Sequence, residues 1–319
     1  MDYQIFFLTG LPKGGTTWTL NMLMSCDDIC CMGEGTFFSS ALKDLPSLYD
    51  SIKTGINTWH NFIAHRKDNW LDLDRHITTI NKTNYVPQGI LDHSLTRQTD
   101  TILRNYVIDL FNRQRNNNIK AIGDKTPLLY IREFKRILRI FPEAKIVFLI
   151  RNLEDFIVSM IFHFWRSHNQ HRADRNICLF ETEDLIAVNN YITNKNEAPI
   201  RDKTLKKLAT IWKDINLFAY RESLSNKNIL IINYEDLKAD TARHLKRILK
   251  FLGIDCNDKI LHDIIDKNSI EYINKHNIST LKDHINTYSL DLKTVLDSNL
   301  YTLLNNFQSS VDKTKDRME

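Results

Sequence analysis

The chain of 319 residues lacks a long hydrophobic run, and no stretch reaches the roughly 18 apolar residues that a membrane-spanning helix needs. It also lacks a strong charge bias: the formal net charge is +4, without the dense basic stripe of a nucleic-acid-binding protein. We therefore expect neither a membrane nor a nucleic acid as partner. With 42% hydrophobic and 26% charged residues, the composition is that of a globular protein able to bury a sizeable core.

Cysteine is scarce as well, and its spacing excludes two kinds of site. The five cysteines contain no C-x-x-C pair, so the sequence predicts free thiols rather than a zinc site or a disulfide framework. The apolar residues 5–8 have no basic segment before them and end at a glycine-rich loop. That pattern predicts a buried strand rather than an export signal, and we expect a cytoplasmic protein that requires no metal.

Glycine is equally rare, but its distribution is informative. Five of the nine glycines lie in the first 35 residues, namely Gly10, Gly14, Gly15, Gly33 and Gly35. Glycine is used where the backbone must turn sharply or approach a ligand closely. The N-terminal segment is therefore the first candidate for a binding site.

Apolar runs alternate with helical patterns along the chain. The expected strand and helix pairs are 5–9 with 16–25, 119–122 with 128–140, 145–151 with 152–167, and 228–234 with 236–252. Continuous apolar strands of this kind are typical of a parallel sheet with helices on both faces. The sequence predicts a three-layer α/β fold with a parallel sheet of four or five strands flanked by helices.

We expect one domain covering residues 1–311. Residues 36–118 are polar, dotted with aromatic side chains and without a clear strand, and we interpret them as a mainly helical insertion that forms an acceptor pocket. The highly charged tail 312–319 is expected to be frayed.

The first motif runs from Gly10 to Thr17 and nearly fits the phosphate-binding pattern G-x-x-x-x-G-K-[ST]. Thr16 occupies the lysine position, and the lysine stands earlier, at Lys13. Backbone N–H groups at the following helix N-terminus would still hold a phosphate. A P-loop kinase or NTPase would also need an aspartate at the end of an apolar strand, whereas the two best strands end in Arg151 and Tyr234.

The segment Pro12-Lys13-Gly14-Gly15-Thr16-Thr17-Trp18 resembles the 5′-phosphosulfate loop of the sulfotransferases that use 3′-phosphoadenosine 5′-phosphosulfate (PAPS). Gly14 replaces a serine of the cytosolic members. The resemblance implies a P-loop-like nucleotide-binding fold. It also implies that the residues from Lys13 to Thr17 bind the 5′ end of PAPS and that Trp18 stacks on the adenine.

A second motif resembles the same family. Arg151 follows a strand at the edge where ligands bind in open α/β sheets, and Ser159 follows eight residues later, as in the family's 3′-phosphate-binding pair. A guanidinium group and a hydroxyl suit a terminal phosphate. Tyr234 resembles a family tyrosine near the adenine. The resemblance covers roughly residues 3–34 and 119–255, and the family's Arg-Lys-Gly stretch is absent from residues 270–310.

Sulfuryl transfer needs a base for the acceptor and positive charge for the leaving phosphate. Lys13 fits the second role. The catalytic histidine of cytosolic members is missing, because Pro127 stands after Lys125 and Thr126. Glu34, 21 residues after Lys13, resembles the glutamate base of tyrosylprotein and bacterial sulfotransferases, and Lys125 is expected to be a second cation.

Two assignments stay open at this point. His93 could assist or replace Glu34, and Asp124 could be a helix cap or a ligand.

The resemblance implies transfer of a sulfuryl group from PAPS to a hydroxyl, or as second choice an amine, of a small-molecule acceptor, leaving 3′-phosphoadenosine 5′-phosphate (PAP). We expect a hydroxylated secondary metabolite as acceptor. The alternatives are a P-loop NTPase or kinase, and a catalytically inactive PAPS-binding protein. The identity of the acceptor and the oligomeric state stay open.

Overall fold

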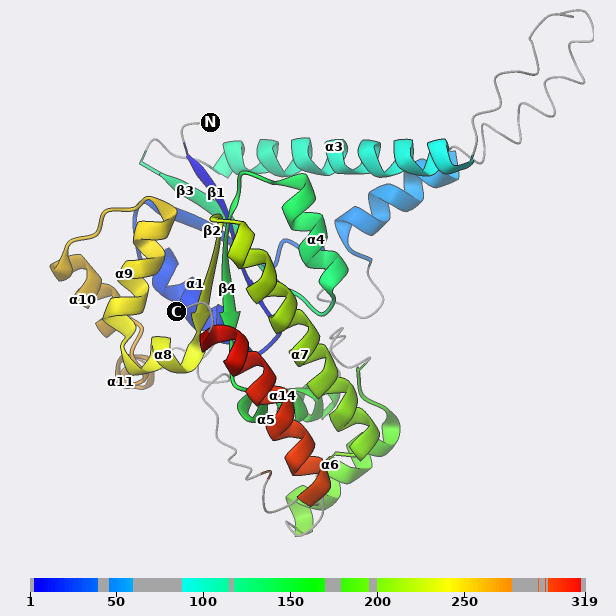
Figure 1. The fold of residues 1–319 in the computed structure, drawn as a ribbon. Helices are drawn as coiled ribbons and strands as arrows, with labels where there is room; N and C mark the ends of the chain where they lie inside the picture. The colour runs from blue at the N-terminus through cyan, green and yellow to red at the C-terminus, as the bar shows by residue number, and fades with distance from the viewer. Residues whose placement is uncertain are drawn as a thin grey trace, which may run out of the picture.

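The computed structural model describes residues 3–39, 46–59, 88–114, 118–169, 179–194, 200–276, 292, 296 and 298–316. Five strands form one sheet in the order β2-β3-β1-β4-β5, and every neighbouring pair is parallel (Figure 1). The strands are β1 (Gln4–Gly10), β2 (Ile29–Gly33), β3 (Ala121–Pro127), β4 (Lys145–Ile150) and β5 (Ile229–Asn233). The predicted parallel sheet is confirmed, at the upper end of the expected strand number.

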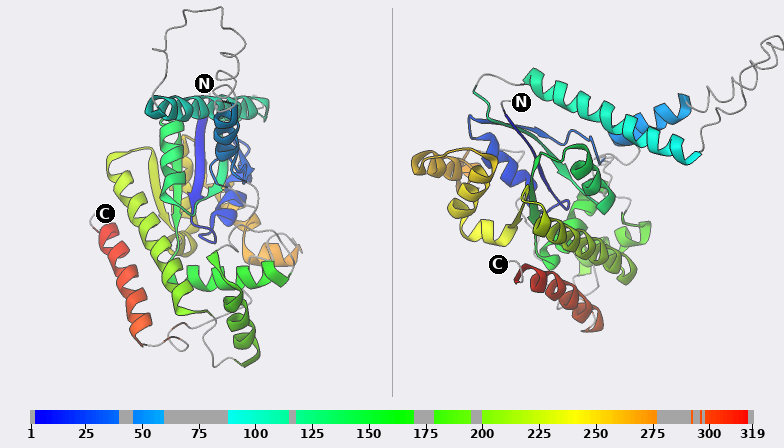
Figure 2. Two further views of the ribbon diagram at one scale, coloured as in Figure 1. Left: turned by 90° about the vertical axis from the view of Figure 1, so that its right-hand side faces the viewer. Right: turned by 45° about the horizontal axis from the view of Figure 1, so that its top comes forward.

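Helices cover both faces of this sheet, so the predicted three-layer arrangement is confirmed (Figure 1, Figure 2). Side chains alternate along a strand, and in β1 they divide between two hydrophobic clusters: Ile5 and Phe7 join one, Phe6 and Leu8 the other. None of the described helices is both long and apolar enough to cross a membrane. Buried side chains of four helices belong to the first cluster: α4 (Ile131–Ile140), α5 (Leu153–Asn169), α7 (Asp202–Ser225) and α14 (Ser298–Asp316). Buried side chains of three helices belong to the second: α1 (Thr16–Met24), α9 (Thr241–Leu252) and α10 (Asp258–Lys267).

The described part of the predicted insertion is helical, in residues 48–59 and in the long helix α3 (Gln88–Gln114). A buried stripe with a spacing of four residues faces the body of the protein, formed by Leu95, Thr99, Leu103, Val107 and Phe111. The end of α3 lies beside the start of β1, where the Tyr3 hydroxyl donates to Oδ1 of Asn112 at 2.8 Å.

Two ion pairs connect these helices to α4. Arg139 Nε lies 2.6 Å from Oδ2 of Asp100 on α3, and Arg136 Nη2 lies 2.8 Å from Oδ1 of Asp50 in the helix 48–59. The prediction that residues 36–118 form an acceptor pocket stays a prediction, because residues 40–45 and 60–87 lie outside the described residues.

The sheet differs from the sequence-based expectation in two places. β2 was not expected as a strand, and β3 continues to Pro127, whereas the prediction ended it at residue 122. Polar residues are tolerated in β3 because they have partners. The hydroxyl of Thr126, for example, donates a hydrogen bond to Oδ2 of Asp124.

The predicted helix 236–252 is wrong in one respect, since it consists of two helices, α8 (Tyr234–Ala239) and α9. The break lies at Asp240, whose Oδ1 accepts a hydrogen bond from the Arg243 backbone N–H at 3.0 Å. An aspartate in this position caps the second helix by satisfying one of its free N–H groups.

The tail was expected to fray from residue 312, and this is wrong for residues 312–316, which complete α14. Lys315 Nζ lies 3.0 Å from Oδ2 of Asp236 on α8, and Val311 is buried. These contacts hold the end of α14 against the body of the protein. Residues 317–319 lie outside the described residues.

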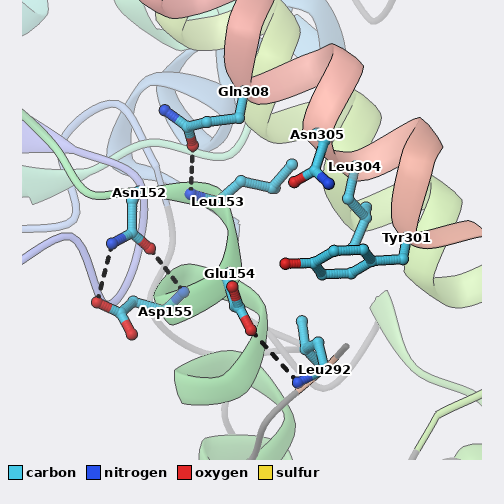
Figure 3. A pocket seen from close by; sticks show the side chains of 9 residues that line it. All are labelled: Asn152, Leu153, Glu154, Asp155, Leu292, Tyr301, Leu304, Asn305 and Gln308. Atoms are coloured by element: carbon cyan, nitrogen blue, oxygen red, sulfur yellow. Dashed lines mark hydrogen bonds between the residues drawn. The ribbon is translucent and has the colours of Figure 1, made fainter. Parts of the chain in front are cut away.

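The middle of α14 contacts the start of α5 (Figure 3). Gln308 Oε1 accepts a hydrogen bond from the Leu153 backbone N–H at 2.8 Å, and Asn152 Oδ1 accepts one from the Asp155 N–H at 2.8 Å. Side chains of both helices line a cavity of about 170 Å³ at this contact. The start of α5 is therefore held both by its own cap and by α14.

Candidate functional site

All five strands end at the same edge of the sheet, because they are parallel. β1 leads into the glycine loop, and β3 ends with the pair Lys125 and Thr126 just before Pro127. The residues directly after the other three strands are Glu34, Arg151 and Tyr234. Ligands of open α/β sheets bind at this carboxyl edge. The fold thus brings every predicted motif to one edge.

The glycine loop has the backbone geometry of an anion-binding turn. Lys13 and Gly15 have positive φ values of 66° and 94°, and Gly15 directly precedes α1. The Gly14 N–H donates to the Leu11 carbonyl oxygen at 3.0 Å, which closes the turn. The first N–H groups of a helix have no partner within the helix, so Thr16 and Thr17 begin α1 with donors that suit an anion.

Gly15 lies directly against the ring of Tyr234. A Cβ atom at Gly15 would lie 2.1 Å from Cδ2 of Tyr234, so no other residue fits there without movement. Tyr234 opens α8 at the end of β5, and burial raises the pKa of its hydroxyl. Two motifs separated by more than 200 residues therefore pack together.

Trp18 and Arg151 complete a cluster around this tyrosine. The ring centroids of Trp18 and Tyr234 lie 5.9 Å apart in an edge-to-face arrangement, and Arg151 Cζ lies 5.2 Å from the Tyr234 centroid. Arg151 Nη1 also donates to the Lys13 carbonyl oxygen at 3.1 Å. The residues expected to bind the two ends of a nucleotide thus meet in one cluster.

A hydrogen bond fixes the backbone of Arg151, and one donor of its guanidinium group has no partner among the described residues. Its carbonyl oxygen accepts a hydrogen bond from Trp212 Nε1 at 2.8 Å, which fixes the backbone at the end of β4. Its Nε atom is buried and has no hydrogen-bond partner within the described residues. A buried guanidinium N–H without a partner suits an anion. Ser159 lies on α5, half-buried, and no described hydrogen bond joins it to Arg151.

Lys125 and Glu34 form an ion pair at the same edge. Lys125 Nζ donates to Oε1 of Glu34 at 2.6 Å and to Oγ1 of Thr17 at 3.3 Å. The Lys125 side chain is 8% exposed, whereas that of Glu34 is 40% exposed. The backbones are joined as well, since the Glu34 N–H donates to the Lys125 carbonyl oxygen at 3.0 Å. A buried cation therefore presents a carboxylate that solvent and a ligand can reach.

Asp124 is a residue of the site that the sequence left ambiguous. It is fully buried and belongs to β3, not to a helix cap. Its Oδ1 accepts a hydrogen bond from the Gly35 N–H at 2.8 Å, and its Oδ2 accepts one from the Thr126 hydroxyl. Burial raises the pKa of this carboxyl to about 6. The available signal was an aspartate directly after the predicted strand 119–122 and its glycine, followed by the polar pair Lys125 and Thr126.

The predicted site residues form two clusters at the glycine loop, and Ser159 belongs to neither. The cluster of Trp18, Arg151 and Tyr234 and the group of Thr17, Glu34 and Lys125 are both joined to the glycine loop. Ser159 lies on the helix after Arg151. The side chain of His93 lies outside the described residues. In the described part of the chain, no group of three or more His, Cys, Asp or Glu side chains is arranged to hold a metal ion.

Comparisons with known proteins show the family of the chain. Residues 5–258 match the model of the sulfotransferase family. A mouse sulfotransferase, SULT7A1, complexed with PAP has a similar fold, with a TM-score of 0.50 and 16% identity over 98% of this chain and 84% of that chain. A sulfotransferase from Alicyclobacillus acidocaldarius has a TM-score of 0.46 and 15% identity over 100% of this chain and 96% of that chain. No curated protein matches the sequence.

Proposed function

The chain belongs to the sulfotransferase family, and from this premise we propose that it transfers a sulfuryl group from PAPS to a hydroxyl group of a small-molecule acceptor. The observation that carries the proposal is the ion pair of Lys125 and Glu34, in which Lys125 Nζ lies 2.6 Å from Oε1 of Glu34 and 3.3 Å from Oγ1 of Thr17 at the start of α1. A cation and an accessible carboxylate next to an anion-binding loop are the groups that sulfuryl transfer requires.

The residues present fit a nucleotide with a phosphate at each end. The loop from Lys13 to Thr17 would hold the 5′ end through its N–H groups, and Trp18 and Tyr234 would flank the adenine. Arg151, whose buried Nε has no hydrogen-bond partner among the described residues, and Ser159 would hold the 3′-phosphate. When bound, PAPS supplies the sulfuryl group and a phosphate leaving group.

The protein's own groups then have distinct tasks. The Glu34 carboxylate would receive the proton of the acceptor hydroxyl, and its exposure of 40% leaves room for that hydroxyl. Lys125 orients this carboxylate and contributes positive charge, and Lys13 contributes a second charge within the glycine loop. All three groups stand on strand ends or on tight turns, which keeps their positions rigid.

The acceptor is proposed to be a hydroxylated secondary metabolite, with an amine as the second choice. The mild net charge of +4 supports a small neutral acceptor over a large polyanion, which would favour a dense basic surface. The protein is proposed to act without a metal ion, because two lysines supply the positive charge at the site.

Calorimetric titration with PAP in the presence of EDTA tests the donor. We expect saturable one-site binding without magnesium, and no such binding in an Arg151→Ala variant. Magnesium-dependent binding of ATP in place of PAP would contradict the proposal and favour a kinase or NTPase. Incubation with radiolabelled PAPS and a panel of hydroxylated and amine acceptors then tests transfer. Tight PAP binding without transfer to any acceptor or to water would favour an inactive binding protein.

A further inference from the structure

The turn after β2 has an unusual backbone. Glu34 and Thr36 have positive φ values of 59° and 55°, in the left-handed region that non-glycine residues rarely adopt. Gly35 lies between them, and a Cβ atom there would lie 2.6 Å from the Phe37 ring and 2.9 Å from Oδ1 of Asp124. Such a conformation persists only where surrounding contacts impose it.

Asp124, in the sheet, forms a hydrogen bond with the turn after β2. Its Oδ1 accepts the Gly35 N–H at 2.8 Å, and its second oxygen is occupied by the hydroxyl of Thr126. Asp124 is fully buried and lies in the middle of β3, paired in register with Phe7 of β1 and Met32 of β2. Its carboxyl group is therefore fixed, and it can impose a position on Gly35.

The neighbouring residue of β3 holds the same turn from a second point. The Lys125 carbonyl oxygen accepts the Glu34 N–H at 3.0 Å, and Lys125 Nζ binds the Glu34 carboxylate. The turn continues directly into the insertion, since the carbonyl oxygens of Thr36 and Phe37 accept the N–H groups of residues 48 and 49 at 2.9 and 3.0 Å. Without Asp124, the N–H of Gly35 would lose the only acceptor that the described residues give it.

We propose that Asp124 is a positioning residue for Glu34: its buried carboxyl group holds Gly35 so that the Glu34 carboxylate faces Lys125 and the acceptor. This inference rests on the proposed function, in which Glu34 is the base. It deepens that function because it assigns a buried side chain to the placement of the base. Burying a carboxyl group is costly unless it is hydrogen-bonded, and both oxygens of Asp124 accept hydrogen bonds.

Several charged and hydrogen-bonding groups around Asp124 shift the pKa of its carboxyl group. Burial raises the pKa of the Asp124 carboxyl, and the negative charge of Glu34 also raises it, whereas Thr126, Gly35 and Lys125 lower it. The remaining titratable neighbour is Cys31 of β2, whose thiol pKa is raised, chiefly by burial and secondly by Asp124. An asparagine could accept the Gly35 N–H without a charge, so Asp124→Asn separates the hydrogen bond from the charge.

The kinetic experiment compares Asp124→Ala and Asp124→Asn with the wild-type protein, using the best acceptor from the panel. Since a displacement of about 1 Å can cost about 100-fold in rate, we expect kcat of Asp124→Ala to fall about 100-fold. PAP affinity should stay within about twofold, because Asp124 touches none of the proposed donor-binding residues. Asp124→Asn should recover most of kcat, because its amide oxygen can still accept the Gly35 N–H.

The matched control is Asp184→Ala. Asp184 is fully buried and accepts backbone N–H groups, but its partners all lie in residues 181–204. It should lower stability and leave kcat of the folded protein unchanged. A folded Asp124→Ala variant with wild-type kcat would overturn the proposal, and so would equal losses of kcat and PAP affinity in Asp124→Asn.

A spectroscopic measurement keeps the inference separate from the proposed function. In the wild-type protein, the amide proton shift of Gly35 should titrate between about pH 5 and 7, near the pKa of about 6 of its acceptor. The titration should vanish in Asp124→Asn. If the wild-type protein neither binds PAP nor transfers a sulfuryl group, the proposed function fails, whereas a Gly35 amide proton shift that is the same in the wild-type protein and in Asp124→Ala overturns the role of Asp124.

Discussion

The Nζ atom of Lys125 lies 2.6 Å from Oε1 of Glu34 and links the end of β3 to the turn after β2. The pair is asymmetric, because the lysine side chain is 8% exposed and the glutamate side chain 40% exposed. The cation is thus almost enclosed in protein while the carboxylate faces outward. Thr17, 3.3 Å from the same Nζ atom, connects the pair to the first turn of α1.

Replacing Glu34 with glutamine should abolish most of the transfer. Removal of a general base typically costs about 100- to 10,000-fold in rate, and we expect a loss in kcat of that order. PAP affinity should be unchanged, because Glu34 is not among the proposed donor-binding residues. The assay is transfer from radiolabelled PAPS, with calorimetry for PAP.

Glu143→Gln is the matched control for this variant. Glu143 has a similar side-chain exposure of 43% and forms an ion pair of the same length, 2.6 Å, with Arg104. Loss of an exposed carboxylate in an ion pair should therefore leave transfer unchanged at this position. Equal activity of Glu34→Gln and Glu143→Gln would exclude Glu34 as the base.

Lys125→Met should also slow transfer while the protein stays folded. Removing one group that stabilises charge in a transition state typically costs about 100- to 1,000-fold. The Glu34 carboxylate left behind is 40% exposed, so water can solvate it, and the free energy of unfolding should change by at most about 1 kcal/mol.

The control for Lys125→Met is Lys120→Met, which removes an exposed lysine that pairs with Asp28 at 2.8 Å and lies just before β3. Chemical denaturation and kinetics on both variants separate stability from catalysis. A Lys125→Met variant with full activity would show that the lysine only orders the apo site.

The sheet could be predicted from the sequence where its strands are continuous apolar runs. β1, β4 and β5 were found because strands buried on both faces are hydrophobic along their whole length. β2 was missed because its apolar run, Ile-Cys-Cys-Met, is only four residues long and contains no β-branched residue after the first. The second half of β3 was missed because Gly123, Asp124, Lys125 and Pro127 are of types that are depleted in strands. Only the structure supplies the partners, such as Gly35 for Asp124, that make these residues acceptable.

The prediction of the site is limited in the same way, because contacts between distant residues cannot be read from the sequence. Arg151 could be located because it follows a predicted strand, at the edge where a parallel sheet binds its ligands. Glu34 and Lys125 were located only through their resemblance to residues of tyrosylprotein and bacterial sulfotransferases. Their mutual contacts could not be predicted, since the Lys125–Glu34 pair depends on the register between β2 and β3. The contact of Gly15 with Tyr234 joins β1 to β5, and no local pattern indicates it.

Gly15→Ala should destroy the donor site. A Cβ atom at this position would lie 2.1 Å from the Tyr234 ring, and the φ value of 94° is unfavourable for alanine. We expect PAP binding to be lost and the unfolding temperature to fall.

Gly55→Ala is the matched control, because Gly55 lies in the helix 48–59 and nothing lies within 4 Å of an added Cβ atom. Alanine is favoured over glycine inside a helix by about 1 kcal/mol, so this variant should bind PAP normally and be slightly more stable. Normal PAP binding by Gly15→Ala would contradict the proposed position of the donor.

Gln308→Ala should weaken the attachment of α14 to the start of α5 (Figure 3). The backbone N–H of Leu153 would lose its acceptor at 2.8 Å, which costs about 1–3 kcal/mol when the group is shielded from water. Asn305→Ala is the control, because Asn305 lines the same cavity, is exposed and makes no described hydrogen bond. Equal stability of both variants in urea denaturation would show that the Gln308 contact is not a stabilising one.

The buried carboxyl of Asp124 should make stability depend on pH in the direction opposite to that of a salt-bridged aspartate. Its pKa is raised by burial from 3.8 to about 6, so the folded protein binds the proton more tightly than the unfolded chain. The stabilising effect is complete below about pH 4, declines as pH rises towards about 6, and is absent above that pH. The difference between the two pKa values corresponds to about 3 kcal/mol.

Asp50 and Asp184 contribute with the opposite sign. Burial alone would raise the pKa of each carboxyl group, but hydrogen bonds and nearby arginines outweigh it and lower the pKa of both. Their effects overlap with that of Asp124 in the wild-type curve, so the decisive quantity is the difference between wild type and Asp124→Asn. Asparagine keeps the acceptor for Gly35 but cannot ionise. The stability of Asp124→Asn relative to wild type should therefore increase between pH 4 and pH 7, by up to about 3 kcal/mol, in urea denaturation at several pH values. A constant difference across this range would mean that Asp124 does not change its protonation there.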